Sequence, residues 1–217
     1  DLPPAPNAPT KIDALSTETK IVLQWTAPTV SSSPGGDIIG YRLEMDDGLG
    51  GDFITVYDGY NAPSMIQFVV GGSPGTYPIT PGRGYRFMIS ARVFNGLGPA
   101  SSMATIYSCT KPVGVQAPTL GTVLSNSMQI KWAEPASNGA CPILGYSMLM
   151  DDGLTGNPTV SVTMSNAVPT LRDVTISLNT ANLGRTYTFK LRVDNLEGTS
   201  TSVDASFLFG IAPSKPP

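Results

Sequence analysis

The chain carries few side chains of the kinds that perform chemistry. Among its 217 residues there are two cysteines, Cys109 and Cys141, and no histidine. The absence of histidine excludes a Ser-His-Asp triad, a Cys-His pair and imidazole ligands for zinc. We therefore predict that the chain is not an enzyme, with no catalytic residue, no cofactor and no bound metal.

An Asp-Asp-Gly motif is the second candidate site, because it occurs at both 46–48 and 151–153. Asp-Gly favours tight turns, since Gly accepts a positive φ and Asp bonds to nearby backbone. Calcium is the alternative, because carboxylate oxygens are its preferred ligands. Asp52, however, aligns with Asn157 in the second copy. The turn is the favoured interpretation, and calcium stays open.

The composition predicts an all-β globular chain. Hydrophobic residues make up 41% and charged residues 13%, and the 23 Gly and 20 Pro lie between short apolar runs. The net charge of −3 and the absence of a Lys/Arg cluster argue against nucleic acid as a partner. Apolar runs such as 207–212 are too short for direct membrane insertion. The chain begins at Asp1 rather than Met, so we expect a processed product or an excised piece.

The chain matches itself at an offset of about 105 residues. Four blocks recur in the same order: "IVLQWTAP" with "MQIKWAEP", "IIGYRLEMDDGLGG" with "ILGYSMLMDDGLTG", "PGRGYRF" with "LGRTYTF", and "VFNGLG" with "VDNLEG". This order predicts a tandem duplication.

Within each copy, apolar residues alternate with polar ones. Ile21, Leu23 and Trp25 alternate in this way, and so does 187–193 in the second copy. A period of two is typical of antiparallel strands that bury one face, as in a sandwich. Further strands are expected at 11–15, 53–57, 65–70 and 103–109, with counterparts in the second half.

These residues resemble the fibronectin type III family, twice over. The resemblance rests on a strand with Trp and then Pro, an Ile-x-Gly-Tyr opening the third strand, and a later Tyr that follows a turn. It implies two tandem seven-stranded immunoglobulin-like β-sandwiches, with Tyr85 and Tyr187 as tyrosine corners. The structural core residues implied are Trp25, Tyr41, Tyr85, Trp132, Tyr146 and Tyr187.

Two details go beyond the family pattern. Tyr85 lies ten residues before Asn95, whereas Tyr187 lies eight before Asn195, which suggests a bulge or a longer hairpin in the first copy. The "GY…MDDGxxG" element resembles domains in large multi-repeat surface proteins of single-celled eukaryotes.

Proline-spaced segments suggest the domain boundaries. We predict a linker at 1–8, a first domain at 9–110, a linker at 111–117, a second domain at 118–211, and a linker at 212–217 to a further domain.

The resemblance also suggests a role for the cysteines. In this family the loop before the third strand lies at the end where the chain enters, and Cys141 is in that loop, whereas Cys109 closes the last strand of the first copy. We infer a Cys109–Cys141 disulfide that staples the junction. Two buried free thiols are the first alternative, and a reactive or metal-binding thiol is the second.

We therefore predict a structural repeat segment of a larger extracellular or cell-surface fibrous or adhesive protein, acting as a stiff spacer. Its expected partners are neighbouring domains of the same chain, other copies, or other surface proteins. Two alternatives stay open: a protein- or glycan-binding module, for which Tyr57, Tyr60 and Tyr77 are candidates, and an accessory domain of a secreted enzyme.

Overall fold

The computed structural model describes residues 2–30, 36–72 and 77–210. The chain divides into two compact units, unit 1 (Asp1–Thr110) and unit 2 (Lys111–Pro217). Each unit is a β-sandwich, so the prediction of an all-β chain with two tandem sandwiches is confirmed. No helix in the described residues is long and apolar enough to cross a membrane.

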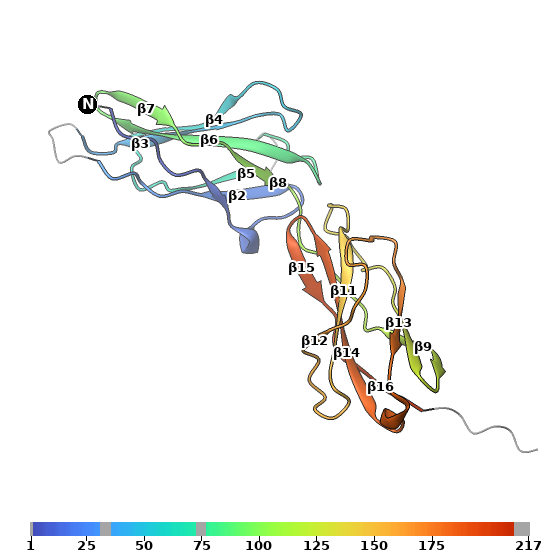
Figure 1. The fold of residues 1–217 in the computed structure, drawn as a ribbon. Coiled ribbons are helices and arrows are strands. Elements are labelled where there is room, and N and C mark those ends of the chain that lie inside the picture. The colour runs from blue at the N-terminus through green and yellow to red at the C-terminus, as the bar shows by residue number, and fades with distance from the viewer. Residues whose placement is uncertain (1, 31–35, 73–76, 211–217) are drawn as a thin grey trace, which may run out of the picture. The chain divides into compact units, whose positions relative to one another are not determined.

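Unit 1 packs a three-stranded sheet against a larger one (Figure 1). The order in the first sheet is β1-β2-β5, and in the second β4-β3-β6-β7, with β8 also paired to β6. The strands are β1 (Thr10–Lys11), β2 (Lys20–Gln24), β3 (Gly40–Met45), β4 (Ile54–Tyr60), β5 (Gln67–Gly71), β6 (Gly84–Val93), β7 (Gly96–Ala100) and β8 (Ala104–Tyr107), and a 3-10 helix η1 spans Asp13–Leu15.

Unit 2 repeats this topology, with sheets β13-β10-β9 and β12-β11-β14-β15, and with β16 paired to β14. Its elements are β9 (Thr119–Leu124), β10 (Ser127–Lys131), β11 (Gly145–Met150), β12 (Val160–Ser161), β13 (Asp173–Ser177), β14 (Thr186–Asn195), β15 (Gly198–Thr201) and β16 (Ala205–Leu208), with a 3-10 helix η2 at Thr180–Asn182. In both units the last strand is split in two, which makes seven strands when the halves are counted together.

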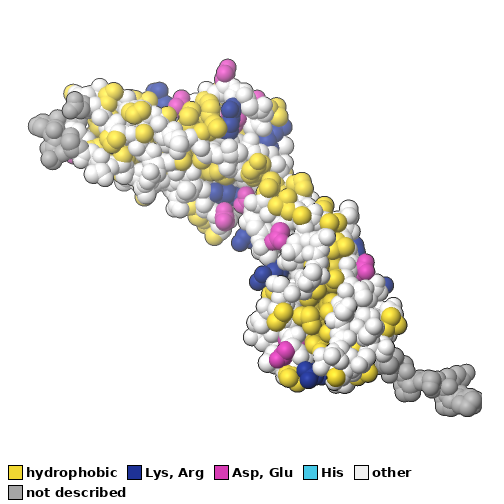
Figure 2. Space-filling view, viewed as in Figure 1, with side chains coloured by type: hydrophobic (Ala, Val, Ile, Leu, Met, Phe, Trp, Pro, Cys, Tyr) yellow, Lys and Arg dark blue, Asp and Glu magenta, His cyan; other side chains and the backbone are white. Residues whose placement is uncertain are grey.

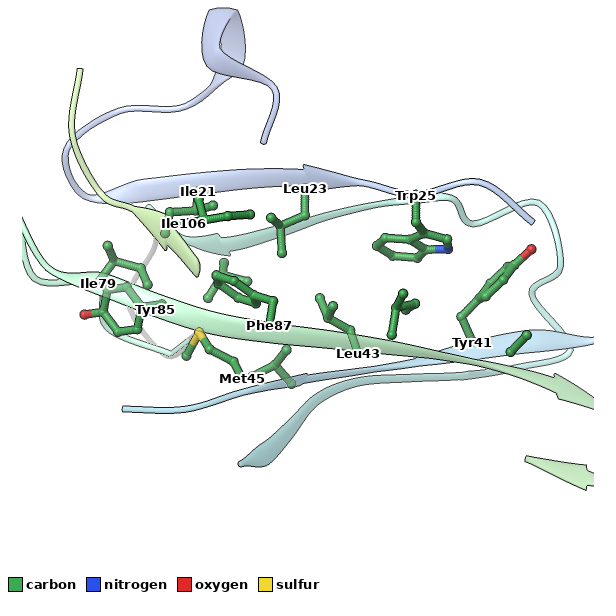
Figure 3. Packing of buried hydrophobic residues seen from close by; sticks show 14 residues of the cluster. Ile21, Leu23, Trp25, Tyr41, Leu43, Met45, Ile79, Tyr85, Phe87 and Ile106 are labelled. Carbon is green, nitrogen blue, oxygen red and sulfur yellow. The ribbon is translucent and has the colours of Figure 1, made fainter. Parts of the chain in front are cut away.

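The alternating residues form the interior of each sandwich. Ile21, Leu23 and Trp25 come from the β2 side and face Leu43 and Phe87 across the core (Figure 3). The core of unit 2 is built from the corresponding strands, and its buried members include Met128, Ile130, Trp132, Tyr146, Met148, Tyr187, Phe189, Leu191 and Val193. Burial of two such apolar faces is the main source of stability in each unit.

One local prediction is wrong, and a second holds in part. The expected strand at 11–15 is only two residues long, and η1 follows it. The hydroxyl of Ser16 donates to Ile12 O and accepts from the Val22 amide, both at 2.9 Å, and these bonds close a turn in place of a strand.

The second prediction concerns the hairpin after Tyr85. β6 and β14 are both ten residues long, so the first copy has no two-residue excess before its turn. Asn95 lies inside the tight turn between Val93 and Gly96, whereas Asn195 is the last residue of its strand. The two asparagines are therefore not structural counterparts and the hairpin is not longer, but the bulge alternative is supported, because the pairing of β6 with β7 shifts register between Ser90 and Arg92.

Each unit opens with a proline-spaced segment that packs on its own sandwich. Pro3, Pro6 and Pro9 are buried in unit 1, and in unit 2 Val113 pairs with Ser137 through backbone hydrogen bonds of 2.9 and 3.0 Å. A Cβ added to Gly98 would meet Pro3 O at 2.5 Å, so the opening segment passes directly over β7. The segments proposed as linkers at 1–8 and 111–117 thus bury part of their surface, whereas 212–217 lies outside the described residues.

Candidate functional site

Both cysteines are disulfide-bonded and fully buried. Cys109 follows β8 at the end of unit 1, and Cys141 lies in the loop between β10 and β11 of unit 2. No free cysteine is present, so neither side chain offers a thiol for catalysis or for metal binding. The pairing of the two with each other stays a prediction.

The backbone around Cys109 is fixed by several hydrogen bonds. The Lys11 ammonium donates to Cys109 O at 2.8 Å and to Tyr107 O at 3.0 Å. The Ser108 hydroxyl donates to Thr80 O at 2.6 Å. The backbone on either side of Cys109, at the end of unit 1, is therefore held in place by hydrogen bonds.

The loop that carries Cys141 is ordered by its own polar side chains. Ser137 Oγ accepts from the Gly139 amide and Asn138 Oδ1 accepts from the Ala140 amide, each at 3.1 Å. Ala140 has a φ of 62°, which is uncommon for a residue other than glycine. Asn195 at the end of β14 donates to Asn138 O at 2.8 Å and ties the loop to the larger sheet.

The first aspartate of the Asp-Asp-Gly motif is buried in unit 1, which the sequence did not indicate. Asp46 is 1% exposed. Its Oδ1 accepts from the Arg86 and Gly48 amides at 2.8 and 3.1 Å, and its Oδ2 accepts from Arg86 Nε at 2.7 Å. Burial alone would raise the pKa of Asp46, but the amide and guanidinium of Arg86 lower it below its ordinary value. Asp46 thus joins the end of β3 to β6.

Asp151 takes the same place in unit 2 with a different set of donors. It is 2% exposed, and its oxygens accept from the Thr188 amide at 2.8 Å and from the Gly156 amide at 2.7 Å. Thr188 stands where unit 1 has Arg86, so the described residues give Asp151 no ion pair of the Arg86–Asp46 kind. A buried carboxylate is here stabilised by amides.

The second aspartate of each motif closes the turn. Asp47 Oδ1 accepts from the Leu49 and Gly51 amides, and Asp152 Oδ1 accepts from the Leu154 and Thr155 amides, at 2.8 to 3.1 Å. These amides lower the pKa of both carboxyl groups. No group of three or more potential metal-ligating side chains occurs in the described part of the chain. Both carboxylates accept from amides of their own loop, as the turn interpretation requires.

The six aromatic residues assigned to the core lie in the two interiors. Trp25 and Tyr41 meet at a ring-centroid distance of 5.7 Å, and Trp132 and Tyr146 meet at 5.8 Å. Trp25 Nε1, Trp132 Nε1 and the hydroxyls of Tyr41 and Tyr146 are all buried without a hydrogen-bond partner in the described structure. The same two polar groups are therefore left unpaired in each unit.

Tyr85 lies at the opposite end of the core of unit 1 from Trp25 (Figure 3). Its hydroxyl accepts from the Thr80 amide at 2.8 Å, which is the backbone contact expected of a tyrosine corner. Tyr187, its counterpart in β14, is 2% exposed and packs against Phe209 at 6.4 Å between ring centroids.

The three tyrosines considered for a binding patch do not form one. Tyr57 packs on Phe68 at 4.9 Å between ring centroids, and Tyr77 donates to Thr55 O at 3.0 Å, so both belong to the side of the sandwich. Tyr60 is 60% exposed and lies under the guanidinium of Arg92. The face visible in Figure 2 shows Lys and Arg side chains in small separate groups, with Asp and Glu between them.

Comparisons with known proteins agree with the class of fold. The chain is 26% identical over 202 residues to fibronectin type III domain containing protein 3C1 of Mus musculus, which covers 91% of this chain and 13% of that protein. It is 30% identical over 142 residues to fibronectin type-III domain-containing protein 3A of Mus musculus, covering 64% of this chain and 11% of that protein.

Among solved structures, a two-domain fibronectin type III segment of chicken tenascin aligns with a TM-score of 0.44 and 14% identity, over 94% of this chain and 98% of that one. No family model matches the chain. The names of the relatives, together with the sandwich topology, support tandem fibronectin type III domains. The chain spans only about an eighth of the length of these relatives.

Proposed function

We propose that the chain is a non-catalytic structural segment of a larger extracellular or cell-surface fibrous or adhesive protein, in which the two units act as a stiff spacer. The observation that carries the proposal is the oxidised state of both cysteines, since disulfides persist in oxidising compartments. Because the chain has only these two cysteines, we pair Cys109 with Cys141.

A bridge between these positions would hold unit 1 and unit 2 at a fixed angle, whereas domains joined by a simple linker swing freely. Its counterpart positions carry glycine, Gly36 before the third strand of unit 1 and Gly210 after the last strand of unit 2. The staple therefore belongs to this junction alone and is not part of the repeated pattern.

The proposed partners are neighbouring domains of the same long chain, other copies of it, and other surface proteins. The great length of the relatives supports the first of these. The likeness to multi-repeat surface proteins of single-celled eukaryotes belongs to the same proposal and rests on the "GY…MDDGxxG" residues alone.

The test is a ¹⁵N relaxation measurement on the whole chain, oxidised and then reduced. We expect both units to report one slow overall tumbling when the chain is oxidised, and shorter, separate correlation times after reduction. A Cys109→Ser/Cys141→Ser variant is the control and should behave like the reduced chain. Independent tumbling in the oxidised chain would contradict the role as a stiff spacer.

A further inference from the structure

A pocket of about 670 Å³ lies at one end of unit 2 and has no role in the spacer proposal. Three segments of unit 2 line it: 134–138 after β10, 142–146 leading into β11, and 169–172 before β13. Its volume falls within the range of pockets that bind small ligands or short peptide segments.

The polar side of the pocket is an ion pair built on an aromatic ring. The guanidinium of Arg172 lies over the ring of Tyr146, 4.9 Å from its centroid, and is paired with the carboxylate of Glu134. Arg172 Nη1 also donates to Pro169 O at 2.8 Å and to Leu171 O at 2.7 Å. Four interactions thus hold the guanidinium in place before any ligand arrives, which reduces the entropy cost of binding.

The pocket also holds unused hydrogen-bonding capacity. Tyr146 lines the pocket, but its hydroxyl is buried out of reach of a ligand, as is that of Tyr41 in unit 1. The Glu134 side chain is 71% exposed, so its carboxylate can still accept from a ligand.

Unit 1 lacks this arrangement, although its backbone is the same. The Trp25 amide donates to Ile66 O and the Trp132 amide donates to Arg172 O, both at 3.0 Å, so Ile66 is the counterpart of Arg172. Ala27 stands in the place of Glu134, two residues after the tryptophan. The ion pair is therefore not needed to build the sandwich.

The walls indicate the class of ligand. Opposite charges of Glu134 and Arg172 compensate each other, which favours a neutral ligand that both donates and accepts hydrogen bonds. The apolar walls are the rings of Pro135, Pro142 and Pro169 with Ile143 beside them. The guanidinium covers the face of Tyr146, so the ring of a ligand meets the proline walls and not the tyrosine.

We propose that this pocket binds a short, extended and uncharged peptide segment that presents a proline. Its pyrrolidine ring lies against the proline walls, and its backbone carbonyl and amide groups bond to the guanidinium and the carboxylate. A proline-rich segment is already extended when free, so it loses little entropy on binding.

The experiment is an NMR titration of the oxidised whole chain with a synthetic alanine–proline decapeptide, and separately with a neutral oligosaccharide. The expected result is a saturable shift of the Trp132 indole and Thr170 amide signals with the peptide only, while the Trp25 indole signal stays fixed. Shifts with the oligosaccharide alone would assign the pocket to a glycan and overturn the proposal. No saturable shift with either probe would overturn it as well.

A variant of unit 2 that carries the unit 1 residues is the matched control. Glu134→Ala with Arg172→Ile should keep the dispersed spectrum of a folded unit, because unit 1 holds Ala27 and Ile66 at these positions. Peptide binding should weaken by about tenfold or more. If the double variant unfolds, Glu134→Gln, which removes only one charge, should weaken binding several-fold. Unchanged peptide affinity in the folded variant would show that the ion pair takes no part.

Discussion

Unit 1 and unit 2 share a core but differ at the ends and sides of that core. Trp25 and Trp132 are buried at matching positions and each meets a buried tyrosine. Next to them the copies differ, because unit 1 has apolar residues where unit 2 has the Glu134–Arg172 ion pair. The interior residues are of the same type in the two units, whereas the residues around them are not.

The sides of the two sandwiches differ in the same way. In unit 1, Tyr57, Phe68 and Tyr77 pack along the side between β4 and β5. In unit 2 the strand β12 has only two residues, and a pocket of about 360 Å³ lies between β12 and β13. Aromatic residues fill this space in unit 1, whereas the corresponding space in unit 2 is open.

The comparison separates the residues that stabilise both sandwiches from the residues that are particular to one unit. Positions that are buried in both units stabilise the fold. The repeat in the sequence identifies these positions. Features found in only one unit, such as the ion pair and the junction cysteines, are not needed for folding and are the places to look for function.

The largest effect is expected from removal of a core tryptophan. Trp25→Ala should destabilise unit 1 and Trp132→Ala unit 2, by about 3–5 kcal/mol each, because a large buried ring is lost and a cavity remains. Urea unfolding followed by NMR signals from each unit measures this. The signals of the unmutated unit serve as the control, and a variant that keeps its full stability would show that the ring does not support its core.

A smaller effect should distinguish the two buried aspartates. Asp46→Asn removes a charge paired with Arg86 and should cost about 2 kcal/mol, whereas Asp151→Asn, which disturbs only bonds from amides, should cost about 1 kcal/mol. The same urea unfolding measures both. Equal costs would show that the guanidinium adds nothing to the amides.

The smallest effect is a difference between the two units in how much stability they lose at acidic pH. The pKa values of Asp46, Asp47 and Asp58 are lowered in folded unit 1, and the pKa of Asp152 is lowered in folded unit 2. Folded unit 1 therefore binds fewer protons than its unfolded form, and this stability is present above pH of about 4 and lost below it.

Between pH 7 and pH 3, the melting temperature of unit 1 should fall by a few degrees more than that of unit 2. Arg42 and Arg92 both pair with the partly exposed Asp58, so high salt at pH 7 should remove a part of this difference. A larger fall in the melting temperature of unit 2 would contradict the assignment of the lowered pKa values to unit 1.

The sequence predicts the sandwiches because alternation and duplication are both local patterns that can be counted. Burial of Ile21, Leu23 and Trp25 follows from a period of two. The strand prediction fails at η1, because the side chain of Ser16 forms hydrogen bonds with the backbone there. Alternation records which face is buried but not such local hydrogen bonds.

The candidate pocket could not be predicted, for a different reason. Glu134 and Arg172 are 38 residues apart, and neither has a charged counterpart in unit 1. The Asp-Gly pattern predicts a turn at Asp46, whereas the burial of its carboxylate depends on Arg86, 40 residues away. Contacts between distant polar side chains leave no pattern in a single sequence.

The central claim is that Cys109 and Cys141 are bonded to each other and fix the junction of the two units. Peptide mapping by mass spectrometry, with free thiols alkylated before any reduction, tests it most directly. The account predicts one linked pair of peptides that contains both cysteines and that separates on reduction. Two singly alkylated cysteine peptides, or a bridge between two chains, would contradict it.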